Sequence, residues 1–240
     1  MSGILITGAS RGVGRALAAA CASSGLWPRI VITALRNEEG LRETARMVSE
    51  AGCPLCVPVL GDVGDLAWVE KLRRDIGPVE TLVNNAAVSR VGLLTDMTPA
   101  EWDEVLRVNL TSLYNTCHTF VPDMVRAGQG RILNISSVWG LAGASCEVAY
   151  SASKGGVNAF TRALAKELAP SHIRVNAAAL GIVDTEMNRH LSDAEKAEIR
   201  DQIPAGYIVS PEEAAQALLK LLTMPEYFNG EIVRLDGCWL

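Results

Sequence analysis

Short apolar runs alternate with longer amphipathic segments along the whole chain, and no other feature constrains the fold as strongly. Strands joined by helical crossovers of about a dozen residues form parallel βαβ units, whose sheets carry helices on both faces. The predicted strands lie at 3–7, 29–34, 55–60, 81–84, 131–136, 174–179 and 231–235. The predicted helices lie at 12–24, 37–51, 65–76, 98–127, 149–169, 192–203 and 211–223. The pattern therefore predicts a three-layer, doubly wound α/β fold with a mostly parallel seven-stranded sheet.

The 240 residues contain no internal repeat and no linker rich in proline, glycine or serine. This continuity predicts a single domain over residues 1–240. The irregular stretch from Gly181 to Leu191 makes the segment at about 181–203 the candidate for a mobile substrate loop.

Composition excludes several classes of protein. The 22 basic and 27 acidic residues leave a net charge of −5, which argues against the broad basic surface that nucleic-acid binding needs. The sequence has no uncharged stretch long enough to span a bilayer and no secretion signal, so a cytoplasmic location is expected. Cys53 and Cys56 form a lone CxxC pair far in sequence from any histidine, so we interpret them as structural and predict no metal site.

A glycine-rich turn, TGASRGVG at 7–14, separates the first predicted strand from the first predicted helix. Such a turn brings backbone N–H groups close to a dinucleotide pyrophosphate, and the helix N-terminus adds partial positive charge. The glycine spacing is a variant of the commoner G-x-G-x-x-G and is a moderate signal alone. The interpretation therefore depends on the position of the turn between a strand and a helix. The sequence thus predicts a Rossmann-type dinucleotide site whose turn contributes Gly8, Ser10, Arg11, Gly12, Val13 and Gly14.

The end of the second strand distinguishes the two nicotinamide coenzymes. An acidic residue there binds the ribose 2′-OH of NAD, whereas an arginine accommodates the 2′-phosphate of NADP. Here the strand is followed by Leu35 and Arg36, with no carboxylate before Glu38. Arg36, together with Arg11 from the glycine turn, favours NADP, although Arg36 could instead be a solvated residue at a helix start.

Tyr150 and Lys154 lie four residues apart in a predicted helix and so share one face. A neighbouring ammonium lowers the pKa of a phenol toward the working pH, as a general acid or base requires. Ser137 follows a buried strand and is expected at the carboxyl end of the sheet, where open α/β folds bind ligands. Ser136 is the competing candidate, and the spacing to Tyr150 favours Ser137.

Together these residues resemble the short-chain dehydrogenase/reductase family, in its single-domain subclass. The matching motifs are TGASRGVG (7–14), Asp62-Val63, NNAA (84–87), Asn109, Ser137, YSASK (150–154), RVNAAALG (174–181), Thr185, SPEEAAQ (210–216) and LDG (235–237). They run along essentially the whole chain in the order that the family shows, which makes the resemblance specific.

The resemblance implies a catalytic tetrad of Asn109, Ser137, Tyr150 and Lys154. Tyr150 would protonate the substrate oxygen as hydride arrives from the nicotinamide, and Ser137 would polarise the carbonyl. Lys154 would hold the nicotinamide ribose and lower the pKa of Tyr150, while Asn109 would anchor a water near Lys154. The further cofactor contacts implied are Asp62 and Val63 at the adenine, Asn85 and Ala86 at the adenosine ribose, and Ile182 and Thr185 at the nicotinamide amide.

Three positions depart from the pattern of the family. Leu180 stands where a proline is usual, and looser placement of the cofactor is the expected consequence. NNAA replaces the commoner NNAG, and Cys238 breaks a glycine pair. Because the tetrad is intact, a working enzyme is expected, and Leu180 alone favours the alternative of a regulator that senses NADP without catalysis.

Within the family, the chain resembles in particular the bacterial 3-oxoacyl-(acyl-carrier-protein) reductases of fatty acid biosynthesis, which implies a ketone carried on an acyl carrier protein. The stretch at 136–155 also resembles a branch in which some members reduce a 5-aminopentanone group on a lysine of elongation factor P. Glu147 could meet the amine of that substrate or be a solvated charge, and both substrates stay open.

The family resemblance also implies a homotetramer. Basic residues are expected near the cleft mouth if the partner is an acidic carrier protein, and Arg126, Arg131 and Arg162 are the candidates. A third possibility among enzymes is an alcohol or sugar oxidoreductase that works in the oxidative direction, against which Arg36 argues.

Overall fold

The computed structural model describes residues 3–189 and 191–240. Its strands are β1 (Ile4–Ile6), β2 (Arg29–Ala34), β3 (Leu55–Leu60), β4 (Thr81–Asn84), β5 (Gly130–Ser137), β6 (Ile173–Leu180) and β7 (Ile232–Leu235). They form one sheet in the order β3-β2-β1-β4-β5-β6-β7, and every neighbouring pair is parallel. The predicted α/β fold with a seven-stranded sheet is confirmed. The strand order reverses between β1 and β4, and in such folds the ligand crevice lies at the carboxyl ends of the strands there.

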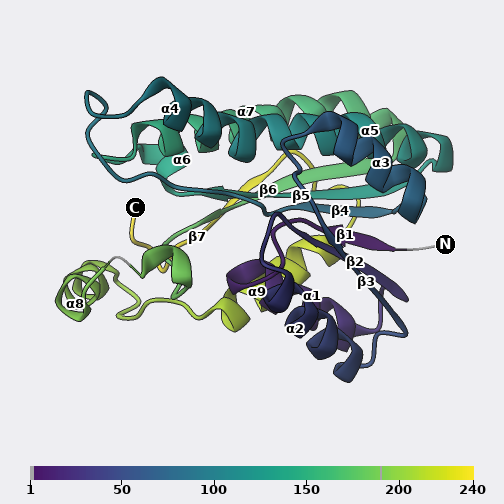
Figure 1. The fold of residues 1–240 in the computed structure, drawn as a ribbon, viewed down its shortest axis with the longest axis horizontal. Helices are drawn as coiled ribbons and strands as arrows, with labels where there is room; N and C mark the ends of the chain where they lie inside the picture. Colours follow the sequence, from purple (N-terminus) through teal and green to yellow (C-terminus); the bar gives the residue numbers. More distant parts are fainter. Residues whose placement is uncertain (1–2, 190) are drawn as a thin grey trace.

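Helices cover both faces of this sheet, as Figure 1 shows. The helices are α1 (Gly12–Ser24), α2 (Glu38–Glu50), α3 (Leu66–Ile76), α4 (Pro99–Leu106), α5 (Ser112–Ala127), α6 (Trp139–Ala142), α7 (Val148–Leu168), α8 (Asp193–Gln202) and α9 (Pro211–Thr223). Helices α3 to α7 lie over one face, α1, α2 and α9 lie over the other, and α8 stands off to one side (Figure 1). Within the described ranges, no helix is both long and apolar enough to cross a membrane.

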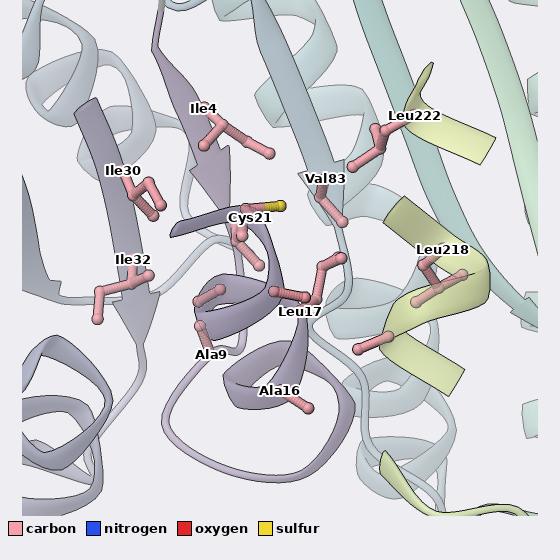
Figure 2. Packing of buried hydrophobic residues seen from close by; sticks show 14 of the residues in the cluster. Ile4, Ala9, Ala16, Leu17, Cys21, Ile30, Ile32, Val83, Leu218 and Leu222 are labelled. Carbon is pink, nitrogen blue, oxygen red and sulfur yellow. The ribbon is translucent and has the colours of Figure 1, made fainter. Parts of the chain in front are cut away.

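The alternation of side chains along the strands divides the core into two clusters. Ile4 and Ile6 pack on the face that α1 and α9 cover, whereas Leu5 packs on the opposite face, under α5 and α7. Figure 2 shows the first cluster, in which Leu17 from α1 and Leu218 from α9 meet β1 and its neighbours. Full burial of such a side chain is worth about 1.5–3 kcal/mol, so both faces of the sheet contribute strongly to stability.

Local sequence signals set several helix ends. Thr98 caps α4 by accepting from the Glu101 N–H, and Glu101 bonds back to the Thr98 N–H, a reciprocal pair that Pro99 at the first position supports. Asp65 caps α3 by accepting from the Ala67 N–H at 3.0 Å. These caps agree with the helix starts predicted from sequence.

The predicted long helix over 98–127 is confirmed as a helical segment without a break, but it is not regular throughout. The structure divides it into α4 and α5, joined by a π-helical turn at Arg107–Thr111 that contains the buried Asn109. A π turn inserts an extra residue into the helix and often occurs at functional sites. The short helix α6 and the 3-10 turns at Ala169–Ser171 and Glu186–Asn188 were also not predicted, because elements of one turn leave no periodicity to detect.

Candidate active site

The glycine turn lies between β1 and α1, as predicted. Gly8 has φ of 65°, and a Cβ there would lie 2.7 Å from the Cα of Ala86, so only glycine fits. Helix α1 begins at Gly12, and Arg11 before it makes no side-chain capping bond. The first N–H groups of α1 therefore keep their capacity for an anion. A backbone cradle that a Cβ would fill, beside an uncapped helix N-terminus, fits a dinucleotide pyrophosphate.

Asn85 holds this turn in place from the end of β4. Its Nδ2 donates to the carbonyl oxygens of Thr7 at 2.9 Å and Gly8 at 3.0 Å. The Thr7 hydroxyl accepts in return from the backbone N–H groups of Asn85 at 3.0 Å and Ala86 at 3.1 Å. The side chain of Asn85 is thus committed to the shape of the turn, a positioning role that the sequence did not reveal. The contacts of Asn85 and Ala86 with the adenosine ribose stay a prediction.

The residues expected around the adenine are fixed at the end of β3. The Asp62 carboxylate accepts from the Gly64 N–H at 2.8 Å and from the Arg107 guanidinium at 2.7 Å. The carbonyl of Val63 accepts from Asn115 at 2.9 Å. Arg107 was not predicted as a site residue, since nothing in its local sequence indicates that it reaches Asp62 across 45 positions of the chain.

The two arginines expected at a 2′-phosphate are both accessible. Arg36 is an exposed residue directly after β2, and Arg11 is exposed in the glycine turn. Arg11 pairs with Glu186 at 2.7 Å, and 55% of the Arg11 side chain and 60% of the Glu186 side chain remain exposed. This ion pair joins the glycine turn to the segment after β6. The Glu186 carboxylate therefore competes with any anionic ligand for the guanidinium of Arg11.

The segment after β6 is folded against its neighbours. Val183 pairs with Val209 in a parallel bridge, and Thr185 lies near Gly12, with its Cγ2 3.3 Å from the place of a Cβ on that glycine. Thr185 therefore lies beside the glycine turn. The contacts of Ile182 and Thr185 with the nicotinamide amide stay a prediction. Residue 190 of the predicted 181–203 loop lies outside the described residues, and the mobility of this loop stays a prediction.

Leu180 is buried and hydrogen-bonded at the edge of the site. It ends β6, its carbonyl accepts from the Val138 N–H at 2.9 Å, and its side chain is 6% exposed. It pairs with Ser137 of β5 on one side and Leu235 of β7 on the other. Leu180 is therefore paired with both neighbouring strands. Its effect on the placement of the cofactor stays a prediction.

The two serine candidates at the end of β5 have different surroundings. The Ser136 hydroxyl donates to Asn158 of α7 at 2.7 Å, so it is a buried packing group. Ser137 is hydrogen-bonded to the Tyr150 side chain and accepts from the Trp139 N–H at 3.2 Å. The geometry therefore favours Ser137 as the residue that acts with Tyr150.

Tyr150 and Lys154 lie on the first two turns of α7, with their side chains on the same face. The Lys154 Nζ lies 5.5 Å from the centroid of the Tyr150 ring and donates to the carbonyl of Ile135 at 2.7 Å. Lys154 is 2% exposed, so its ammonium is withdrawn from water. The structure thus brings together three of the four predicted catalytic side chains at the carboxyl end of β5.

The pKa of Tyr150 shifts in the direction opposite to the prediction. Burial raises the pKa of this phenol, the nearby Glu147 raises it further, and only the hydrogen bond with Ser137 lowers it. Burial also lowers the pKa of Lys154 to about 8. The pKa of Tyr150 is therefore raised overall, against the predicted net lowering, because desolvation outweighs the lowering influences. A protonated phenol is the form that can give a proton to an oxyanion.

Asn109, the fourth tetrad residue, is fully buried in the π-helical turn. Its Oδ1 accepts from the Val88 N–H at 2.8 Å, and its Nδ2 donates to the Val88 carbonyl at 2.9 Å and the Ser153 hydroxyl at 3.1 Å. Ser153 directly precedes Lys154, so Asn109 ties the loop after β4 to the catalytic helix. Its predicted role as a water anchor stays a prediction.

Glu147 is part of the site rather than a free surface charge. Its carboxylate accepts from the Ser89 hydroxyl at 2.7 Å, and it is close enough to Tyr150 to raise the pKa of that phenol. The sequence left this residue open because its partner, Ser89, is 58 positions away. The structure places a carboxylate beside the reacting hydroxyl.

Two of the arginines considered as contacts for an acidic carrier protein, Arg126 and Arg131, lie far from the site. Arg131 lies at the start of β5 and Ser137 ends it, a separation of about 20 Å at ~3.3 Å per residue. Arg126 lies near the end of α5, just before β5 begins, and pairs with Asp123. Both arginines are therefore at the edge of the sheet opposite the site, and the expectation that they line the cleft mouth is wrong.

A close approach between α6 and α7 sets the position of Lys154. A Cβ on Gly140 would lie 2.6 Å from the backbone carbon of Lys154. We expect Gly140→Ala to lower the free energy of unfolding by about 1–3 kcal/mol through overpacking. Gly155→Ala is the matched control, because the nearest atom to its Cβ would be 3.7 Å away and alanine favours a helix by about 0.5–1 kcal/mol. Urea denaturation of both variants tests this, and equal effects would contradict it.

Comparisons with known proteins agree with the fold. A family model described as short chain dehydrogenase matches residues 2–196. The uncharacterized oxidoreductase YmfI of Bacillus subtilis is 38% identical over 98% of this chain and 97% of its own. The 3-oxoacyl-[acyl-carrier-protein] reductase of Aquifex aeolicus is 35% identical over 97% of this chain and 95% of its own.

A solved structure from Agrobacterium tumefaciens shares the fold and contains bound NADP. This protein, provisionally named a 2-deoxy-d-gluconate 3-dehydrogenase, is 31% identical with a TM-score of 0.90. The alignment covers 99% of this chain and 96% of that one. The likeness therefore extends over the whole sheet and both helical layers.

Proposed function

The chain belongs to the short chain dehydrogenase family, and on that basis we propose that it is an NADPH-dependent oxidoreductase that reduces a ketone to an alcohol. The preferred substrate in this proposal is a 3-oxoacyl group on an acyl carrier protein. The observation that carries the reaction type is the cluster of Ser137, Tyr150 and Lys154 at the carboxyl end of β5, close to a glycine turn that fits a pyrophosphate.

In this mechanism, bound NADPH supplies the hydride that reduces the carbonyl carbon. Ser137 donates a hydrogen bond to the carbonyl oxygen and polarises it. Tyr150, kept protonated by burial, transfers its proton to the oxygen as negative charge develops there. The ammonium of Lys154 stabilises the phenolate that remains, 5.5 Å from its ring centroid. Asn109 keeps this part of α7 in place through Ser153.

The coenzyme preference in the proposal is supported by Arg36 and Arg11 and by the NADP in the related solved structure. The remaining cofactor contacts proposed are Gly8, Ser10, Gly12, Val13 and Gly14 at the phosphates, Asp62 and Val63 at the adenine, Asn85 and Ala86 at the ribose, and Ile182 and Thr185 at the nicotinamide. Tyr150 and Lys154 are proposed to contact the ribose of the nicotinamide.

Glu186 forms an ion pair with Arg11, so Glu186→Gln leaves the Arg11 guanidinium free for the 2′-phosphate of NADPH. The substitution is therefore expected to strengthen the binding of NADPH. The exposed ion pair is worth about 0.2–1 kcal/mol, so its removal should lower the Kd for NADPH by at most about fivefold. The Kd for NADH, which lacks the 2′-phosphate, should not change. Calorimetric titration of both coenzymes measures this, with Glu50→Gln as a control at an exposed pair on α2. An equal change for both coenzymes would show that Arg11 does not contact the 2′-phosphate.

The acyl-carrier-protein substrate is supported by the name of the Aquifex relative, with 35% identity over nearly the whole chain. The direct test is the loss of NADPH absorbance when the purified protein is mixed with a 3-oxoacyl-carrier protein. Turnover supports the proposal. Tight binding of NADPH without turnover on any ketone would favour the non-catalytic alternative.

A second candidate substrate is the 5-aminopentanone group on a lysine of elongation factor P. Glu147 favours it, because a carboxylate beside the reacting hydroxyl can bind the ammonium of such a substrate. Comparison of kcat/KM for the two protein-bound ketones decides between them. The homotetramer and the cytoplasmic location belong to the same proposal, and sedimentation in solution tests the first.

A further inference from the structure

The segment after β7, residues 236–240, folds into a tight turn around one carboxylate. Asp236 accepts from the backbone N–H groups of Cys238 and Leu240, each at 3.1 Å. Arg234 pairs with Asp236 at 3.4 Å and donates to the carbonyl of Leu240. The Asp236 side chain is only 4% exposed, whereas that of Arg234 is 45% exposed. The bonds to Asp236 on both sides of Trp239 fix the place of this residue.

This turn joins α6 to the segment that follows α8. The Gly237 carbonyl accepts from the Ala205 N–H at 3.2 Å, just beyond α8. On the other side, the Trp239 ring meets the ring of Trp139 in α6 edge to face, with centroids 5.1 Å apart and an interplanar angle of 60°. Figure 1 shows the chain end between α6 and α8, away from the body of the sheet.

The indole pair is close to the reacting groups. The backbone N–H of Trp139 donates to the Ser137 hydroxyl at 3.2 Å, so α6 begins directly beside the catalytic serine. Both rings are only half-buried, so each keeps apolar surface for a further contact. The contact between the two indoles is ring to ring.

We propose that Trp139 and Trp239 form one apolar wall of the substrate site, and that Trp239 is a specificity-determining residue for the carbon chain attached to the ketone. The inference rests on the proposed ketone reduction at Tyr150 and Ser137. Indole faces bury the methylene groups of an alkyl chain well, and such burial removes apolar surface from water. A longer chain therefore gains from this wall, whereas a short ketone does not reach it.

The test uses 3-oxoacyl thioesters of N-acetylcysteamine with four and eight carbons, reduced by the full-length protein with NADPH. Trp239→Ala is expected to lower kcat/KM for the eight-carbon thioester by about tenfold relative to the four-carbon one, which corresponds to ~1.4 kcal/mol. Trp239→Phe should lose less. Leu240→Ala, an exposed neighbour in the same turn, is the matched control and should not change the ratio.

Two further readouts separate specificity from a merely structural role. The Kd for NADPH and the melting temperature of Trp239→Ala are measured beside the kinetics. An equal loss for both chain lengths, or no loss, overturns the inference. If the wild type reduces neither thioester, the proposed function fails. The inference is then decided by calorimetric measurement of the binding of the eight-carbon thioester. Weaker binding to Trp239→Ala than to the wild type supports the inference. Equal binding to the two proteins, or no binding to the wild type, contradicts it.

Discussion

Tyr150→Phe should lower kcat for ketone reduction by about 10²–10⁴-fold, because it removes only the hydroxyl that gives the proton to the substrate oxygen. The ring remains, so the packing of α7 and the 5.5 Å contact with Lys154 are retained. The Kd for NADPH is expected to rise far less than kcat falls, because only one of the proposed coenzyme contacts is lost. Steady-state kinetics with a 3-oxoacyl thioester, together with coenzyme titration, measure both quantities.

Tyr227→Phe is the matched control for this variant, since Tyr227 is fully exposed and lies far from β5 in sequence. It should leave kcat and the melting temperature unchanged. If Tyr150→Phe retained the activity of the control, the proton would come from another group and the proposed mechanism would fail.

Lys154→Met should remove activity and yet preserve or increase stability at neutral pH. Burial lowers the pKa of Lys154 from 10.5 to about 8, so the ammonium costs free energy in the folded state. That cost is fully present below pH 8 and is relieved as the pH rises toward 10.5, because the unfolded chain then binds more protons than the folded one. The stability gained by removing the buried ammonium is at most about 3 kcal/mol. The loss of the hydrogen bond from Lys154 to the Ile135 carbonyl reduces this gain.

Urea denaturation at pH 7 and pH 9.5 measures this effect. The wild type is expected to gain stability over this interval through Lys154, whereas Lys154→Met should lack that gain. Lys166→Met, at an exposed position on the same helix, is the control and should follow the wild type. A variant with the same pH dependence as the wild type would show that the folded protein holds Lys154 in water-like surroundings.

Local sequence predicted the parts of the site that follow one another along the chain. Gly8 follows a buried strand and Gly12 opens a helix, so the cradle could be derived from a single strand-turn-helix unit. Ser137 at a strand end and the pair Tyr150 and Lys154 on one helical face were found in the same way. Most of these assignments require only the pattern within one element, whereas the choice of Ser137 over Ser136 also used its spacing to Tyr150.

Contacts between distant segments could not be predicted. The bond of Asn85 to the glycine turn, the pair of Glu186 with Arg11, and the packing of Trp239 on Trp139 depend on how the strands assemble. The direction of the Tyr150 pKa shift was missed for a related reason. Sequence identifies a neighbouring ammonium, but it does not give the degree of burial, which is the larger influence here.

The most direct test of the account is to follow the transferred hydrogen. NADPH deuterated on one face of the reactive nicotinamide ring carbon, and separately on the other face, is incubated with the protein and a 3-oxoacyl substrate. The account predicts that deuterium from one of the two labelled coenzymes, and not from the other, appears on the carbinol carbon of the product. An alcohol that carries no deuterium from either coenzyme, or no alcohol at all, would contradict hydride transfer at the Tyr150 site.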